Sequence, residues 1–131
     1  TTAPKDFGLN NVDLHKKFYV FEGPIDSMFI DNSIAVAGSD IVSVLEKLNI
    51  DKSKAIICYD NEPRSKEIVL KVKKTIDKGY NVCLWPENIQ HKDVNDMVMS
   101  GKSIADIKLL IDQNNYNDLE AKVRYISWKK I

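Results

Sequence analysis

The sequence has few of the residues that mark disulfide-rich, fibrous or membrane proteins. It contains two cysteines in 131 residues, both inside apolar runs, which excludes a disulfide framework and a zinc ribbon and favours free thiols in a reducing compartment. Five glycines and four prolines exclude a collagen-like or low-complexity chain. No apolar run approaches the ~18 residues of a membrane span, and no signal peptide is visible. We therefore expect a cytoplasmic protein without a membrane partner.

The chain also lacks an excess of charge of either sign. It carries 19 basic and 19 acidic residues, and the formal net charge is zero. Domains that hold nucleic acid by charge alone tend to be plainly basic, so the balance argues against this class. If the chain handles nucleic acid, bound metal ions or another domain must supply much of the positive charge.

What the sequence does have is a regular alternation of apolar runs and amphipathic segments. The runs predict strands over residues 17–21, 33–37, 54–59 and 80–85. Helices are predicted between and after them, so the fold class is α/β, with a four-stranded, mainly parallel sheet covered by helices on both faces. We expect one domain over residues 1–131, with residues 1–16 as a lead-in segment. The first residue is not Met, so we interpret the chain as a piece of a longer protein.

Capping and breaking residues predict where the helices begin and end. Ser39 or Asp40 is expected to cap a helix that ends at Leu48, and Pro63 is expected to open one that runs to Lys78 before Gly79. Ser103 is expected to cap another helix. Short helices are predicted over 25–32 and near 94–100, and the tail is predicted to be helical to about residue 124.

Acidic residues follow three of the four predicted strands. They are Glu22 and Asp26 after the first, Asp60 and Glu62 after the third, and Asp93 and Asp96 beyond the fourth. Parallel sheets place ligand sites beyond the carboxyl ends of their strands, so these side chains are expected to meet. Gathered carboxylates repel one another unless cations neutralise them, and Mg²⁺ or Mn²⁺ suits such oxygen ligands. The pattern predicts a metal site that can handle phosphate, with Lys92 or Arg64 touching the phosphate.

Each acid also has a simpler explanation as a helix cap or a solvated charge. Asp60 or Glu62 could cap the helix expected to begin at Pro63, and Asp93 could cap the next helix. The lysines of the helix from residue 66 to 78 are explained by a solvated face, or else by a stripe that contacts phosphates. A receiver domain of a response regulator is disfavoured, because it needs paired acids after the first strand and a lysine after a fifth.

Three blocks resemble the signature of the Toprim domain of bacterial-type DNA primases, topoisomerases and some nucleases: "EGPID", "DNE" and "KDVND". With the ending "AKVRYISWKKI", the likeness is strongest to primases of large tailed coliphages. The resemblance implies a DNA primase, a nucleotidyltransferase that uses Mg²⁺ or Mn²⁺ to make RNA primers from ribonucleoside triphosphates on single-stranded DNA. It also implies a replicative helicase as partner and, for a phage protein, the cytoplasm of the host cell. It assigns catalysis to Glu22, Asp60 and Glu62, metal binding to these and Asp93, and supporting roles to Gly23, Asp26, Asn95 and Asp96.

The chain departs from the bacterial primase pattern in two blocks. It has Asp60-Asn61-Glu62 where Asp-x-Asp is usual, and Asp93-Val94-Asn95 where Asp-Pro-Asp is usual. A zinc ribbon and a basic template-gripping subdomain are absent from this sequence, so we expect the isolated domain to be weak or inactive. Two alternatives stay open: a Toprim nuclease, and a non-catalytic replisome docking module that uses the segment with Leu119, Val123, Tyr125 and Trp128.

Overall fold

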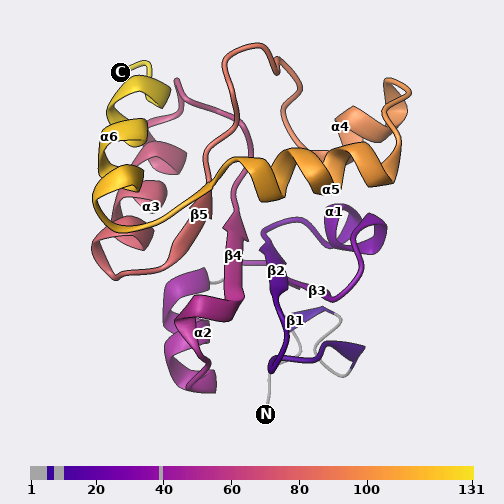
Figure 1. Ribbon diagram of the computed structural model, residues 1–131, viewed down its shortest axis with the longest axis vertical. Helices are drawn as coiled ribbons and strands as arrows, with labels where there is room; N and C mark the ends of the chain where they lie inside the picture. The colour runs from indigo at the N-terminus through magenta and orange to yellow at the C-terminus, as the bar shows by residue number, and fades with distance from the viewer. Residues whose placement is uncertain (1–5, 8–10, 39) are drawn as a thin grey trace.

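The computed structural model describes residues 6–7, 11–38 and 40–131, with side chains from residue 11 onward. Its sheet has six strands in the order β1-β3-β2-β4-β5-β6. The four central strands pair in parallel, and the short edge strands β1 and β6 pair antiparallel to β3 and β5 (Figure 1). The strands are β1 (Asp6–Phe7), β2 (Phe18–Phe21), β3 (Ser33–Val36), β4 (Ala55–Cys58), β5 (Asn81–Cys83) and β6 (Asn115–Tyr116).

The predicted α/β class and the four parallel strands are confirmed. All side chains of β2, β4 and β5 are buried, as expected for strands covered on both faces. The edge strands were not predicted, because two residues carry no periodic signal. β1 lies inside the expected lead-in; residues 1–5 and 8–10 of that segment lie outside the described residues.

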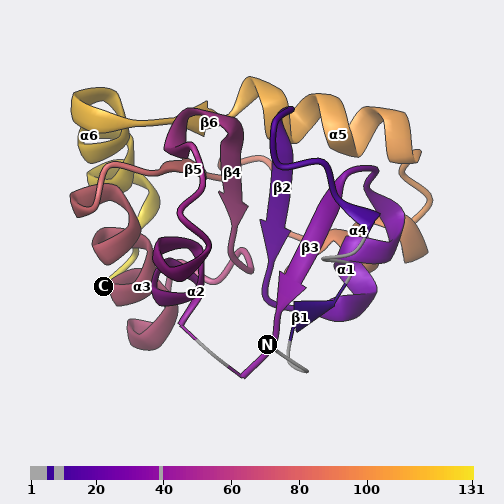
Figure 2. The ribbon, with the colours of Figure 1, turned by 90° about the horizontal axis from the view of Figure 1, so that it is seen from below.

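Helices cover both faces of the sheet and create two apolar cores. Alternate residues of β2 divide between these cores: Phe18 and Val20 face one, and Tyr19 and Phe21 face the other. The first core is covered by α2 (Ile41–Leu48), α3 (Lys66–Asp77) and α6 (Asp118–Trp128), and the second by α1 (Pro24–Phe29), α4 (Val94–Met99) and α5 (Ile104–Gln113). Figure 2 shows the two groups on opposite sides of the strands. A 3₁₀ turn, η2 (Lys52–Lys54), precedes β4.

The predicted start of α3 at Pro63 is wrong. The chain first makes a turn in which the Ser65 N–H donates to the Glu62 carbonyl at 3.0 Å. Ser65 then caps the helix by accepting from the Ile68 N–H, so α3 begins at Lys66 and ends at Asp77. The serine cap, which satisfies a free N–H, outweighs the preference of proline for a first helical position.

The other helix boundaries differ less from the sequence prediction. Ser103 caps α5 as predicted, with the Asp106 N–H as donor at 3.0 Å. Asp40 occupies the cap position of α2, but its side chain binds Lys74 and Ser43 instead of a helix N–H. The alternative cap Ser39 lies outside the described residues. α6 continues past the expected residue 124 to Trp128, because Tyr125 and Trp128 pack into the first core.

The strand register brings the loops after β2, β4 and β5 to one edge of the sheet. Phe21 lies opposite Cys58, and Ile57 lies opposite Val82, so these three strands end at nearly the same level. In Figure 1, β2 and β4 both point toward the upper edge. Among the described residues, no helix is long and apolar enough to cross a membrane.

Candidate metal centre

Three aspartates from separate segments meet at this edge of the sheet. Asp26 lies in α1, Asp60 follows β4, and Asp93 precedes α4. One oxygen atom from each of the three carboxylates lies within 4.8 Å of the other two. We call these three residues the acidic cluster. The meeting of three loops predicted from the sequence is therefore present, with Asp26 as its first member.

Asp26 is the most buried acid of the cluster, with 5% of its surface exposed. Its Oδ1 accepts a hydrogen bond of 2.8 Å from the Asn95 N–H in the first turn of α4. A side chain at Gly23 would place its Cβ 3.1 Å from Asp26 Oδ2, so glycine leaves the carboxylate its space. Burial raises the pKa of Asp26, and the Asn95 hydrogen bond opposes that shift.

Asp60 carries the clearest electrostatic signature of the cluster. Its pKa is raised to about 6, first by burial and then by repulsion from Asp26, Asp93 and Glu22. The ammonium of Lys92 lowers this pKa but does not outweigh the other effects. An aspartate in this state gains much from a nearby cation, which removes the repulsion among the carboxylates.

Asp93 is also the cap of α4, as the simpler explanation held. One of its carboxylate oxygens accepts from the Asp96 N–H at 2.8 Å. A carboxylate has two oxygens with several acceptor sites, so capping leaves it able to take part in the cluster. Capping does not explain Asp60 or Glu62, because Ser65 caps α3.

Asn61 fastens the loop that carries Asp93 to the end of β4. Its side-chain amide donates to the carbonyls of Ile89 and His91 at 2.9 and 3.1 Å, and its backbone N–H donates to the Lys92 carbonyl at 2.6 Å. Its Oδ1 accepts from Trp128 Nε1 at 3.3 Å. Asn61 thus holds the two loops of Asp60 and Asp93 together, a role that sequence reasoning missed.

Glu22 lies beside the acidic cluster but is not one of its three members. Its Oε2 binds Lys71 Nζ of α3 at 2.7 Å, and the two side chains are 22% and 36% exposed. Lys71 also lies 3.4 Å from the exposed Glu67. The hydrogen bond that Lys71 donates to Glu22 raises the pKa of Lys71. The sequence predicted no fixed cation next to these acids, and Lys71 was missed because it lies 49 residues away from Glu22.

The remaining predicted site residues lie around the cluster in different settings. Asn95 contributes its backbone N–H to Asp26. Asp96 is exposed, and its Oδ2 accepts from the Lys92 N–H at 3.3 Å. Glu62 is half-buried in the turn before α3 and lies outside the group of three. Arg64 is exposed and lines a separate cleft next to Asn61.

This arrangement is chemically suited to a hard divalent cation. Its donors are carboxylate oxygens on three rigid attachment points, and Mg²⁺ sites commonly combine one or two carboxylates with water and substrate phosphates. A cation would lower the electrostatic cost of ionising Asp60 and would present positive charge to a phosphate.

The comparison with curated proteins gives one match that bears on function. The chain is 35% identical over 131 residues to the DNA primase of Enterobacteria phage T4. The chain is therefore related in sequence to a phage DNA primase. The match covers 98% of this chain and 37% of the relative, so the chain spans little more than a third of that protein's length. No family model matches the chain.

Proposed function

We propose that this chain is a Toprim-type nucleotidyltransferase domain of a phage DNA primase, which joins ribonucleotides into primers on single-stranded DNA. The observation that carries the proposal is the meeting of Asp26, Asp60 and Asp93 at the carboxyl edge of a parallel sheet. The similarity to the T4 primase and the Toprim-like blocks support the same function.

The residues at this edge fit a resident Mg²⁺ or Mn²⁺ ion. Asp26, Asp60 and Asp93 would hold it. The raised pKa of Asp60 indicates that its ionised carboxylate would be stabilised by a cation. When bound, a divalent ion activates the attacking hydroxyl and stabilises negative charge on the transferring phosphate. The rigid sheet holds the carboxylates, and the Asn61 hydrogen bonds fix the loop of Asp93.

Glu22 is assigned as the catalytic carboxylate beside the cluster. Lys71 engages one of its oxygens, so the other oxygen is available to accept a proton or to complete a metal site. Glu62 is assigned to the outer part of the metal site, and Lys92 to the phosphate of an incoming nucleotide. Gly23, Asn95 and Asp96 shape the site through space and backbone hydrogen bonds.

The proposed substrates and partners belong to the whole primase. They are single-stranded DNA template, ribonucleoside triphosphates and a replicative helicase, in the cytoplasm of the infected cell. This chain corresponds to 37% of its relative, so we expect it to be weak or inactive in isolation.

The test is primer synthesis by the full-length protein with Glu22→Gln, measured as incorporation of labelled ribonucleotides on single-stranded DNA. We expect loss of synthesis with an unchanged circular dichroism spectrum. Glu67→Gln is the matched control, because Glu67 is a second acid on Lys71 but is exposed on α3. Wild-type synthesis by the Glu22 variant would refute its role. Shortening of the template by the wild-type protein would support a nuclease, and the absence of both activities would support a docking module.

A further inference from the structure

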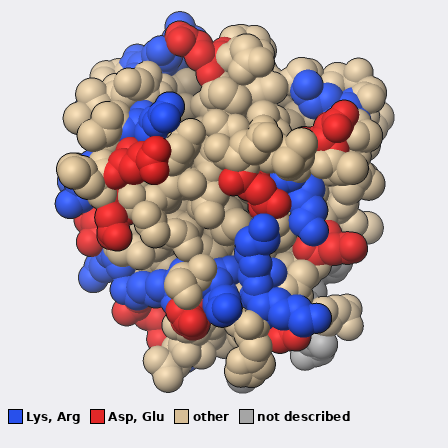
Figure 3. All heavy atoms as spheres, viewed as in Figure 1, with Lys and Arg blue, Asp and Glu red and all other residues tan. Residues whose placement is uncertain are grey.

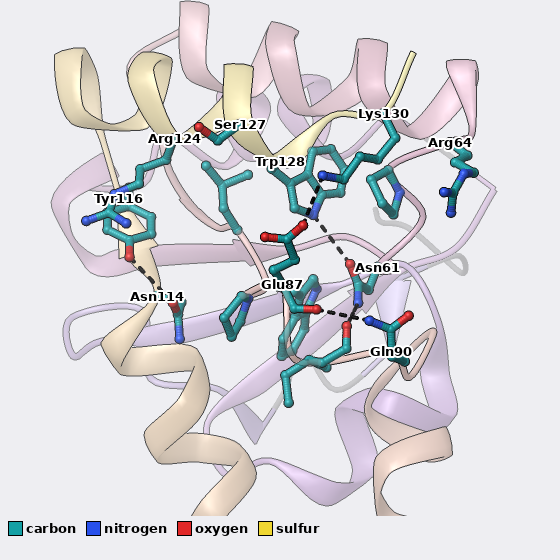
Figure 4. A pocket seen from close by; sticks show the side chains of 15 residues that line it. Asn61, Arg64, Glu87, Gln90, Asn114, Tyr116, Arg124, Ser127, Trp128 and Lys130 are labelled. Carbon is teal, nitrogen blue, oxygen red and sulfur yellow. Dashed lines mark hydrogen bonds and ion pairs between the residues drawn. The ribbon is translucent and has the colours of Figure 1, made fainter.

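A cleft lined in part by Asn61 contains none of the three aspartates of the acidic cluster. It is formed by the loop after β4, the loop after β5, β6 and the carboxyl-terminal part of α6 (Figure 4). Its volume is about 510 Å³, which is in the range of ligand sites. Leu84, Trp85 and Pro86 line it together with polar side chains, so it combines apolar and hydrogen-bonding surface.

The charge of the cleft is unlike that of the chain as a whole. The sequence has two arginines, Arg64 and Arg124, and both line this cleft together with Lys130. Among the described lining residues, Glu87 is the acid that opposes these three cations. The lining therefore carries a net positive charge in a chain with zero net charge, although Arg124 also lies 3.9 Å from Glu120 of α6. Arginine is the side chain best suited to phosphate, because its planar guanidinium donates two parallel hydrogen bonds.

Aromatic side chains lie between the charged ends of the cleft. The Arg124 guanidinium lies over the Tyr116 ring, 4.9 Å from its centre. Figure 4 shows Arg64 and the Arg124–Tyr116 pair at opposite ends, with Trp128 between them. Trp128 is 8% exposed, so half-buried Tyr116 offers the larger aromatic surface to a base, and the cations suit the phosphates of the same ligand.

The cleft is also continuous with the acidic cluster through one residue. Asn61 lines the cleft, follows Asp60 directly and binds the carbonyls of Ile89 and His91 in the loop that leads to Asp93. Asn61 therefore links the wall of the cleft to both loops that carry Asp60 and Asp93.

We propose that this cleft binds a segment of single-stranded nucleic acid, with phosphates on Arg64, Arg124 and Lys130 and a base against the aromatic surface. The inference extends the proposed function, but binding in the cleft needs no metal and no catalysis. An apolar peptide is disfavoured, because it would offer no anionic group to the guanidinium groups of Arg64 and Arg124.

Glu87 tunes this binding through its contact with Lys130. The two side chains pair at 3.4 Å, and Glu87 is 89% exposed. Exposed pairs of this kind contribute little stability, so a phosphate can take over Lys130 while Glu87 turns to solvent. Removal of the Glu87 charge is therefore expected to strengthen binding of a polyanion.

The test measures fluorescence anisotropy of a labelled single-stranded oligonucleotide with the 131-residue chain, in EDTA and over a range of salt concentrations. The double variant Arg64→Gln, Arg124→Gln is expected to weaken binding about tenfold and to reduce the slope of log affinity against log salt by about 1.4, since each phosphate contact on a single strand contributes ~0.7. Glu87→Gln is expected to tighten binding about twofold.

The matched control is Lys66→Gln, Lys122→Gln, which removes the same charge from exposed residues of α3 and α6 that do not line the cleft. Weakening by the control equal to that of the arginine variant would overturn the proposal. So would an absence of oligonucleotide binding at low salt. Because EDTA is present throughout, these outcomes are independent of the proposed metal site.

Discussion

At the scale of single residues, Asp60 determines how the acidic cluster responds to pH. Its carboxylate lies among Asp26, Asp93 and Glu22, and its pKa is raised to about 6 in the folded protein. In the unfolded chain this aspartate titrates near 3.8. At a pH between these two pKa values, folding therefore takes up a proton. At a higher pH, the cost of ionising Asp60 in the folded protein opposes folding.

The first prediction concerns the metal-free protein between pH 4 and pH 7. The native state binds more protons than the unfolded state in this window, so the contribution of Asp60 to stability falls as the pH rises. In Asp60→Asn this contribution is absent. The free energy of unfolding of the wild type, minus that of the variant, is expected to fall by about 1–3 kcal/mol from pH 4 to pH 7. Urea denaturation in EDTA at each pH measures this difference, and a flat difference would exclude the raised pKa.

The sequence predicted which acids gather at this edge, but it assigned their roles differently from what the structure indicates. Asp26 was assigned a supporting role, and the structure makes it the most buried member of the cluster. The direction of a side chain on the six-residue helix α1 depends on how α1 packs against α4, which no local pattern encodes. Glu22 was placed at the centre, and its pairing with Lys71 follows from the distant docking of α3.

At the scale of elements, Asn61 couples the end of β4 to the loop before α4. Its side chain uses both amide hydrogens on carbonyls of that loop and its oxygen on Trp128 of α6. Three segments are therefore held by one half-buried side chain. The only sequence signal for this role was an amide between two acids directly after a buried strand.

The second prediction is that Asn61→Ala destabilises the protein by about 2–3 kcal/mol, because two partly buried carbonyls lose their donors. It is also expected to weaken Mg²⁺ binding, since the loop of Asp93 is no longer fixed. Chemical denaturation with and without Mg²⁺ measures both effects. Gln90→Ala is the control, because Gln90 makes one exposed hydrogen bond within the same loop. Equal stability of the two variants would show that Asn61 does not hold the loops.

The regular elements were the most predictable part of the fold. Continuous apolar runs gave the four central strands, and amphipathic spacing gave the helices, because both depend on side chains that must be buried. The start of α3 was mispredicted, since Pro63 and Ser65 are both good start signals and only the turn through Glu62 decides between them. The edge strands depend wholly on neighbouring strands.

At the scale of the whole molecule, the formal net charge is zero, but the charged side chains are unevenly distributed over the surface. Figure 3 shows cationic side chains in a band across the lower half of the face drawn in Figure 1, away from the edge to which β2 and β4 point. The acidic cluster lies at that opposite edge. A polyanion approaching the cluster would need a metal ion to offset the negative charge there.

The third prediction is that millimolar Mg²⁺ or Mn²⁺ raises the melting temperature. A ligand that binds only the folded state stabilises it by mass action. A metal concentration about ten times the dissociation constant adds about 1.4 kcal/mol, or about 3–6 °C for a domain of this size. We expect the melting temperature to rise at pH 7.5 and to rise less at pH 5, where Asp60 is mostly protonated. In Asp60→Asn we expect no rise. Differential scanning fluorimetry with Ca²⁺ and Na⁺ controls measures it.

The central claim is that Asp26, Asp60 and Asp93 share a divalent cation. Anomalous diffraction from crystals soaked in Mn²⁺ tests it most directly, because the ion itself is located. We predict an anomalous peak bonded to oxygens of at least two of the three aspartates, and its absence in Asp60→Asn crystals. Full occupancy of Mn²⁺ elsewhere, with no peak at these carboxylates, would contradict the account.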